Sequence, residues 1–408
     1  MMQERAQRME DAINLKVPDR VPIVASFNAF PAKYVEGVTC EDAFYNPRKW
    51  FDACKKTIAD FAPDSYTIQG MIAGPVMDAL GNKVLLLPGR GCAADHSFQF
   101  VEAEYMKADE YQAFFADPSD FAVRTHLTRI FENTRGFAKL PPLTDLISGN
   151  GIMGLLEPLS QPEVQDSFKA LIKAGEETKK WRIISAAFGS QMAELGFPPS
   201  RTATSWAPFD LLPDMLRGMK GTMLDMYRQP DNVLAACEKI LPWSIEKGIT
   251  SAQKGGATRV FIPLHRGAMG FMSIKQFEKF YWPTFKRLLL ALIDAGLTPA
   301  PFIEGDYSDR LEYFLELPRG KVLGHFDTTD IFKAKQVLGK HMCIQGNFPA
   351  SLLQTGNPRE VREHTRKLIE GVGKDGGYIM ACRGSMDEAN PELVKVWIDS
   401  TKEFGVYR

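Results

Sequence analysis

The sequence predicts an α/β fold, a (β/α)8 TIM barrel with an inserted segment that covers one face of the barrel. Between residues 259 and 382, short apolar segments repeatedly end in residues that can bind a metal or move a proton, and helical patterns separate these segments. Short buried strands that alternate with helices are typical of a parallel sheet. In a barrel of this kind the C-terminal ends of the strands carry the chemistry.

Eight candidate strands support this fold class. Two precede residue 74 and six follow residue 200, and each is a short run rich in apolar or β-branched residues. The expected strands are 21–27, 65–69, 202–206, 260–264, 301–304, 322–326, 342–345 and 378–382.

Helical spacing of apolar residues fills most of the intervals between the strands. Pro47 suits the first turn of the helix that it begins, and the clearest patterns lie at 276–295 and 359–372. The expected helices are 3–15, 46–61, 109–131, 166–195, 211–219, 230–254, 276–295 and 359–372.

Residues 74–200 do not keep the alternation of strand and helix. Short alternating runs at 82–88 and 96–101, with glycines between them, predict an antiparallel excursion. The stretch 141–162 is rich in Gly, Pro and Ser but also contains Leu, Ile and Met, which favours an ordered loop or lid. We therefore expect one domain over 1–408, with 74–200 as an insertion.

Composition restricts the class of protein. A net charge of −1 argues against nucleic acid as the main partner, and the six scattered cysteines lack a CxxC pair and predict reduced thiols. The charged residues 1–9 have no apolar signal core, and the longest apolar run, 288–293, is too short to cross a membrane. The expected location is the cytoplasm, with no membrane partner. The oligomeric state is left open, a homodimer included.

Several short motifs, in order and spacing, resemble the uroporphyrinogen decarboxylase superfamily. The resemblance runs over most of the chain and is weakest in 84–200. The motifs are Arg8 with Asp19–Pro22, Phe277–Pro283, Gln345–Asn347, and Gly377–Ile379 followed by Asn390–Glu392.

The resemblance implies a (β/α)8 barrel and one of two chemistries. One is metal-free decarboxylation of a porphyrinogen, and the other is zinc-dependent methyl transfer to or from a corrinoid protein. True decarboxylases carry an arginine-rich stretch after the first strand that binds substrate carboxylates, whereas residues 25–31 here contain no arginine. A substrate with many carboxylates needs several charge-assisted partners, so the methyltransferase branch is favoured.

The resemblance also implies a ligand set for zinc. The methyltransferase branch has His-x-Cys-Gly-Asp after a barrel strand and a cysteine near the last strand. At these places this chain has Phe302-Ile303-Glu304-Gly305-Asp306 and Cys382. Glu304 and Cys382 with His325, one strand later, would give three zinc ligands and an open position, the catalytic pattern. Zinc would then act as a Lewis acid on a methyl ether or on a thiol.

Other residues receive expected roles around this site. His265 is a candidate general acid or a replacement ligand, and Asp306 and Asp327 are candidates for catalysis or for orienting a ligand. The alternative reading of both aspartates is that they cap the following helices. Residues expected to line a substrate pocket are Tyr66, Trp206, Arg266 and Phe348. The other four histidines, at 96, 126, 341 and 364, lie in polar sequence and are expected at the surface.

The leading hypothesis is a methyltransferase that moves a methyl group between a small methylated compound, such as an aryl methyl ether, and a separate corrinoid-carrying protein. A second is a metal-free decarboxylase, in which Arg266 and Arg383 hold a carboxylate and Asp306 or His265 moves protons. A third is a non-catalytic barrel that binds a corrinoid protein. The sequence identifies neither the methyl donor nor the direction of transfer.

Overall fold

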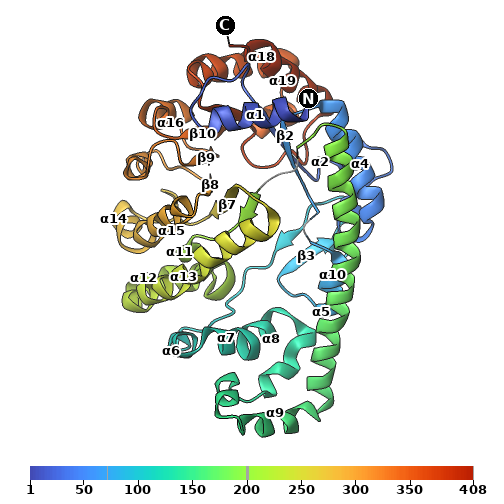
Figure 1. Cartoon of the computed structure of the whole chain (residues 1–408), viewed down its shortest axis with the longest axis vertical. Coiled ribbons are helices and arrows are strands. Elements are labelled where there is room, and N and C mark those ends of the chain that lie inside the picture. Colours follow the sequence, from blue (N-terminus) through green and yellow to red (C-terminus); the bar gives the residue numbers. More distant parts are fainter. Residues whose placement is uncertain (71, 199–201, 408) are drawn as a thin grey trace.

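Eight parallel strands form the central sheet of the computed structural model, which describes residues 1–70, 72–198 and 202–407. Their order is β2–β1–β11–β10–β9–β8–β7–β6, and the sheet curls into a TIM-barrel-like arrangement with helices outside it (Figure 1). The predicted fold class is confirmed. The strands are β1 (Ile23–Asn28), β2 (Ser65–Ile68), β6 (Thr202–Thr204), β7 (Arg259–Leu264), β8 (Thr298–Ile303), β9 (Leu323–Phe326), β10 (Cys343–Gly346) and β11 (Tyr378–Ala381).

Alternation along the strands separates the two faces of the sheet. In β7, Val260, Ile262 and Leu264 are fully buried in the main core, whereas Phe261 and Pro263 between them are partly exposed. β8 repeats this pattern. Successive side chains of a strand point to opposite faces, so the fully buried set faces the helices and the other set faces the barrel interior.

The helix α1 (Met2–Ile13) closes one end of the barrel. Its buried face, which includes Met9 and Ile13, packs in a small cluster with Leu323, Cys343 and Ile379 from the first halves of their strands. The C-terminal ends of the strands therefore lie at the opposite end, which we call the mouth.

A buried ion-pair network fixes α1 to the sheet. Asp64, whose side chain is fully buried, accepts hydrogen bonds from Arg8 (2.5 Å) and Arg20 (2.7 Å), and Arg8 also pairs with Asp19 (2.6 Å). Asp64 also accepts the backbone N–H of Ile23, the first residue of β1. The motif Arg8 with Asp19–Arg20 is thus explained by a structural role.

Helices pack around the sheet and account for the periodic segments of the sequence. Local signals set their ends: Asn357 and Glu360 form a capping box on α18, and Gly256 ends α13 in the left-handed conformation. These helices are α2 (Phe30–Tyr34), α3 (Asp42–Tyr45), α4 (Pro47–Phe61), α11 (Pro208–Leu211), η4 (Leu212–Leu216), α12 (Gly218–Arg228), α13 (Pro230–Gly255), α14 (Ile274–Gln276), η5 (Phe277–Tyr281), α15 (Trp282–Asp294), η6 (Leu311–Glu316), α16 (Ile331–Leu338), α17 (Ala350–Thr355), α18 (Pro358–Leu368), η7 (Ile369–Gly373) and α19 (Pro391–Phe404).

The segment between β2 and β6 forms a separate group of elements beside the barrel (Figure 1). Its longest helix, α10, runs from beside α4 to the tip of this group, where α9 lies. The elements are α5 (Gly74–Leu80), β3 (Leu85–Pro88), β4 (Gly91–Cys92), β5 (Gln99–Phe100), α6 (Tyr111–Ala116), α7 (Pro118–Asp120), η1 (Phe121–His126), α8 (Leu127–Ile130), η2 (Glu132–Lys139), η3 (Leu143–Ser148), α9 (Gly151–Leu159) and α10 (Pro162–Glu194).

Two predictions for this segment have clear outcomes. β3 pairs antiparallel with β5, which confirms the antiparallel excursion. The single helix predicted for 109–131 is wrong, because Asp117 caps a new helix that begins at Pro118. A proline cannot donate the backbone hydrogen bond that would continue the first helix. The domain boundaries predicted for the insertion stay a prediction.

Among the described residues, no helix has the length and apolar character needed to cross a membrane.

Candidate active site at the mouth of the barrel

Three polar residues follow directly after three neighbouring strands. Leu264 of β7 pairs with Ile303 of β8, and Ile303 pairs with Phe326 of β9. The next residues along the chain are His265, Glu304 and Asp327, so the register of the sheet places them side by side at the mouth. The Nε2 atom of His265 lies 3.9 Å from Oε1 of Glu304. The structure thus brings together three of the residues that the sequence singled out.

Asp214 is a further member of this group, and the sequence analysis missed it. It lies in η4, and its Oδ2 accepts a hydrogen bond from Nδ1 of His265. Its other carboxylate oxygen lies 3.5 Å from Nη2 of Arg266. The carboxylate therefore fixes the orientation of the imidazole and directs Nε2 toward Glu304.

Asp210, one turn before Asp214, was also missed. Its side chain is fully buried and accepts three hydrogen bonds: from the backbone N–H of His265 (3.1 Å), from that of Arg266 (2.9 Å) and from the hydroxyl of Tyr281 (2.6 Å). Tyr281 belongs to the motif Phe277–Pro283. Asp210 and Asp214 are four residues apart, so they lie on one face of a helix. This pair of acidic residues, soon after a predicted strand, was the signal in the sequence that could have identified them.

Charge around His265 favours its protonated form. Burial lowers the pKa of His265, but the hydrogen bond and charge of Asp214, with the charges of Asp210 and Glu304, outweigh burial and raise it to about 9. Burial raises the pKa of Glu304, and burial raises that of Asp210 to about 6. His265 is therefore an imidazolium at neutral pH, with its Nε2–H facing a carboxylate that is too distant for a direct hydrogen bond.

Close packing fixes the backbone after His265. A Cβ on Gly267 would lie 2.3 Å from the hydroxyl oxygen of Tyr307 and 2.9 Å from the ring of Tyr281. Both tyrosines are fully buried. Only a glycine fits here, so the segment that holds His265 lies tightly against the tyrosine that Asp210 binds.

The two predicted catalytic aspartates have local hydrogen bonds. Asp306 accepts from the backbone N–H (2.8 Å) and the hydroxyl (2.5 Å) of Ser308, and Asp327 accepts from the backbone N–H of Gly305 (3.2 Å). These contacts order the loop after β8. The charge of Asp327 also acts on Glu304, where it raises the pKa of that carboxyl. Catalytic roles for Asp306 and Asp327 stay predictions.

The three predicted zinc ligands are not gathered at one point. Within the described ranges, no group of three or more His, Cys, Asp or Glu residues is placed to hold a metal ion. Nε2 of His325 lies 3.1 Å from the carbonyl oxygen of Cys382, and burial lowers the pKa of this histidine to about 4. Cys382 is fully buried in the main apolar core with Phe348, and burial raises the pKa of its thiol. These residues, as placed, do not fit zinc, and zinc binding stays a prediction.

The residues predicted to line a substrate pocket lie in different places. Arg266 is at the mouth beside Asp214, with its guanidinium 4.9 Å from the centre of the Phe271 ring. Trp206 stacks on Trp243 of α13, and Tyr66 of β2 contacts Phe197. Phe348 is fully buried against Trp397. Of the four, Arg266 belongs to the group around His265, which it follows directly in the chain, and the ring contacts described for the other three are with other residues.

Aromatic rings that the sequence analysis did not single out lie on the interior side of the sheet. Phe302 lies 4.7 Å from the ring of His325 and 6.4 Å from that of Phe261, measured between ring centres. Phe302 lies in β8 two residues before Glu304, which follows the strand, and the alternation of the strand directs Phe302 to the side of the sheet that Glu304 continues. A row of partly exposed rings therefore lies beneath the polar group at the mouth. The signal available in the sequence was the position of Phe302 two residues before Glu304, because residues two apart along a strand point to the same side.

Comparison with known proteins agrees with this architecture. The family described as "Uroporphyrinogen decarboxylase (URO-D)" matches residues 157–404, well over half of the chain. Among curated relatives, uroporphyrinogen decarboxylase of Syntrophotalea carbinolica is 28% identical over 175 residues (43% of this chain, 49% of the relative). That of Geobacter sulfurreducens is 28% identical over 194 residues (46% and 55%). The chain thus spans about half the length of the curated relatives it matches.

A solved structure extends the likeness to nearly the whole chain. A "methyltransferase from Methanosarcina mazei" superimposes with a TM-score of 0.62 over 98% of both chains, at 14% sequence identity. At this level of identity the likeness establishes a shared fold.

Proposed function

The chain belongs to the uroporphyrinogen decarboxylase family, and from that premise we propose that it is a methyltransferase that moves a methyl group from a small methyl ether to a corrinoid carried by a partner protein. The name of the Methanosarcina mazei structure supports the reaction class. The missing arginines in residues 25–31 support it as well, because a porphyrinogen substrate needs cationic partners for its carboxylates.

The observation that carries the proposal is the arrangement of Asp214, His265 and Glu304. Asp214 binds one nitrogen of the imidazole, and the other nitrogen lies 3.9 Å from a carboxylate oxygen of Glu304 at the mouth. This arrangement suits a general acid, because Asp214 holds the protonated imidazole in one orientation. The Nε2–H of His265 lies 3.9 Å from Glu304, too far for a hydrogen bond to that carboxylate.

Ether cleavage needs such an acid. The methyl carbon exchanges its bond to oxygen for a bond to the reduced cobalt, which supplies the electron pair of the new bond. The electrons of the broken C–O bond remain on the oxygen, and Nε2 of His265 gives its proton to that oxygen, so that an alcohol or phenol leaves. Asp214 stabilises the imidazolium before this step, and water restores the proton afterwards. No step uses zinc.

The charges at the mouth support an uncharged substrate. Four carboxyl groups, those of Asp210, Asp214, Glu304 and Asp327, surround two cations, the imidazolium of His265 and the guanidinium of Arg266, and both cations already lie beside Asp214. Because like charges repel strongly in a partly desolvated site, a polycarboxylate would be excluded from this mouth. A neutral methyl ether has no such penalty.

The test uses free cobalamin in place of the unidentified corrinoid protein. Purified protein is incubated without oxygen with reduced cobalamin and a panel of methoxybenzenes and dialkyl methyl ethers, and methylcobalamin formation is followed by absorbance. We expect formation faster than in the enzyme-free reaction with at least one ether, and loss of that excess rate in His265→Gln. Absence of any enzyme-dependent methylcobalamin would contradict the proposal.

Decarboxylation is the second candidate, because the curated relatives are named uroporphyrinogen decarboxylase. In that case Arg266 holds one carboxylate and the imidazolium of His265 protonates the carbanion left by loss of CO2. Enzyme-dependent CO2 release from a monocarboxylic acid, with no methyl transfer, would favour this function.

A further inference from the structure

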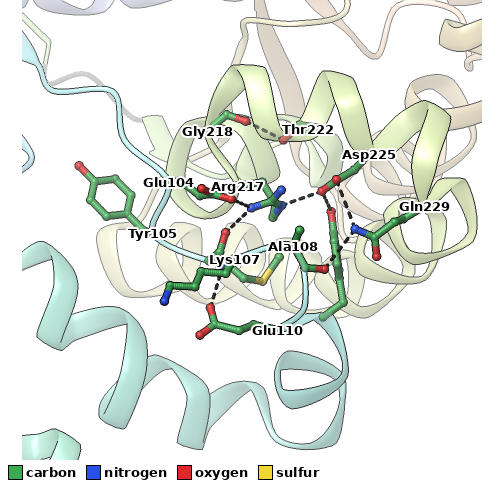
Figure 2. Close-up of polar contacts among 12 residues, drawn as sticks. Glu104, Tyr105, Lys107, Ala108, Glu110, Arg217, Gly218, Thr222, Asp225 and Gln229 are labelled. Atoms are coloured by element: carbon green, nitrogen blue, oxygen red, sulfur yellow. Dashed lines mark hydrogen bonds and ion pairs between the residues drawn. The ribbon is translucent and has the colours of Figure 1, made fainter.

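Arg217 lies at the end of the turn that holds Asp214, and its side chain is almost completely buried. Its Nε donates to Oδ2 of Asp225 (2.6 Å), and its Nη1 donates to a carboxylate oxygen of Glu104 and to the carbonyl oxygen of Met106 (2.5 Å). Figure 2 shows the guanidinium between Glu104 on one side and Asp225 on the other. One cation thus joins α12 to the loop formed by residues 101–111.

Asp225 extends the network to the far end of the same loop. Its Oδ2 also accepts a hydrogen bond from the hydroxyl of Tyr111 (2.9 Å). Gln229, one turn later, donates to the carbonyl oxygen of Ala108 (3.1 Å) (Figure 2). Burying these charges is costly unless each has partners, and removing one partner leaves the others unpaired. The Arg217 side chain is therefore one of the buried groups that hold this loop against α12.

The same loop binds the backbone of η4. The carbonyl oxygen of Leu216 accepts the N–H of Tyr105 (2.8 Å) and of Met106 (2.7 Å), and the N–H of Arg217 donates to the carbonyl oxygen of Leu212 (2.7 Å). Asp214 lies at the centre of this turn. On the N-terminal side of η4, Asp210 of α11 accepts hydrogen bonds from the backbone N–H groups of His265 and Arg266 and so holds that end of the turn.

We propose that Arg217 is a positioning residue for the active site, which fixes η4 between the loop 101–111 and α12 and so holds Asp214 against His265. Because this loop belongs to the segment between β2 and β6, the inserted elements help to orient the imidazole although none of the contacts described here joins them to it. The importance of Arg217 for catalysis rests on the proposed function, but its effect on the position of Asp214 is measurable without a substrate.

The experiment reads the hydrogen bond between His265 and Asp214 directly. A proton shared between an imidazole and a carboxylate gives an NMR signal far downfield of other N–H protons, and histidine-selective 15N labelling with Asp214→Asn identifies it. We expect Arg217→Met to abolish or shift this signal, and Arg217→Lys to restore it in part, since lysine keeps the charge but not the fork of donors. If methyl transfer is measurable, kcat should fall on the order of 10- to 100-fold with little change in KM.

Arg124→Met is the matched control. Arg124 forms a two-pronged ion pair with Asp120 and binds the carbonyl oxygen of Leu140, inside the inserted segment but away from η4. This variant should leave the signal unchanged. If Arg217→Met does not fold, the milder Glu104→Gln decides, because Glu104 is half-exposed. The inference would be overturned if Arg217→Met folded and kept the wild-type signal of the proton between His265 and Asp214. If Arg217→Met did not fold, a wild-type signal in Glu104→Gln would overturn it. Absence of methyl transfer with an altered signal would contradict only the proposed function.

Discussion

The Nε2 atom of His265 lies 3.9 Å from a carboxylate oxygen of Glu304, across the ends of two neighbouring strands. The separation exceeds a hydrogen bond, so the proton on Nε2 remains available to a substrate oxygen. This relationship underlies the proposed acid catalysis.

Replacing His265 tests that role. Because Gln cannot donate an acidic proton, we expect His265→Gln to lower kcat by about 10²- to 10⁴-fold, the usual contribution of a general acid. The measurement is the rate of methylcobalamin formation, with circular dichroism to verify folding. His96→Gln serves as control, since His96 is largely exposed and pairs with its neighbour Asp95. Equal activities of the two variants would remove His265 from the mechanism.

Gly267 should tolerate no side chain. The Cβ of Gly267→Ala would overlap Tyr307 and Tyr281, so we expect a loss of about 1–3 kcal/mol in the free energy of unfolding and a displaced His265. Gly270→Ala is the matched control three residues later, because a Cβ there meets nothing within 4 Å. Urea unfolding of both variants, with activity alongside, makes the comparison. Similar stability of the two would show that this segment shifts freely.

The position of Cys382 predicts how its thiol reacts. It is fully buried, and burial raises its pKa, whereas Cys92 is partly exposed. We expect iodoacetamide to modify Cys92 in the native protein and Cys382 only after unfolding, with or without a chelator. Peptide mass spectrometry measures both. If a chelator made Cys382 reactive in the native protein, the thiol would be a metal ligand, as the sequence resemblance implied.

His126 should make the protein less stable in mild acid. It was expected at the surface, but its Nδ1 is buried without a partner in the described part of the chain. Burial, together with the charge of Arg129, lowers its pKa to about 4 from 6.5. Between pH 6.5 and pH 4 His126 binds a proton in the unfolded chain but stays neutral in the folded chain. The free energy of unfolding therefore decreases as the pH falls from 6.5 to 4.

The loss attributable to His126 is up to about 3 kcal/mol at pH 4. His126→Phe keeps the ring that contacts Tyr105 but cannot titrate, so its melting temperature should fall less between pH 7 and pH 4 than that of the wild type. The melting temperature of His96→Gln should fall between pH 7 and pH 4 by as much as that of the wild type. Parallel curves for all three proteins would show that burial of His126 has no such effect.

The sequence predicted the barrel because its signals are local. Short apolar runs, helical spacing and caps depend on neighbouring residues, and they located the strands to within a few residues. The strand-end rule also placed His265, Glu304 and Asp327 at one edge, because adjacent parallel strands end together. The helix predicted for 109–131 failed where a local signal, Asp117–Pro118, was overlooked.

The rest of the site depends on where side chains point and on which distant segments pack together, and the order of residues in the sequence does not show either. Asp214 meets His265 across 51 residues because η4 packs over the end of β7. Cys382, by contrast, lies at a strand end but packs in the core beside Phe348 and directs only its carbonyl oxygen toward His325. The sequence by itself determined which strands form the barrel and which residues follow them. The tertiary structure alone decided which side chains meet, because strand register, side-chain direction and the packing of distant helices fix those contacts.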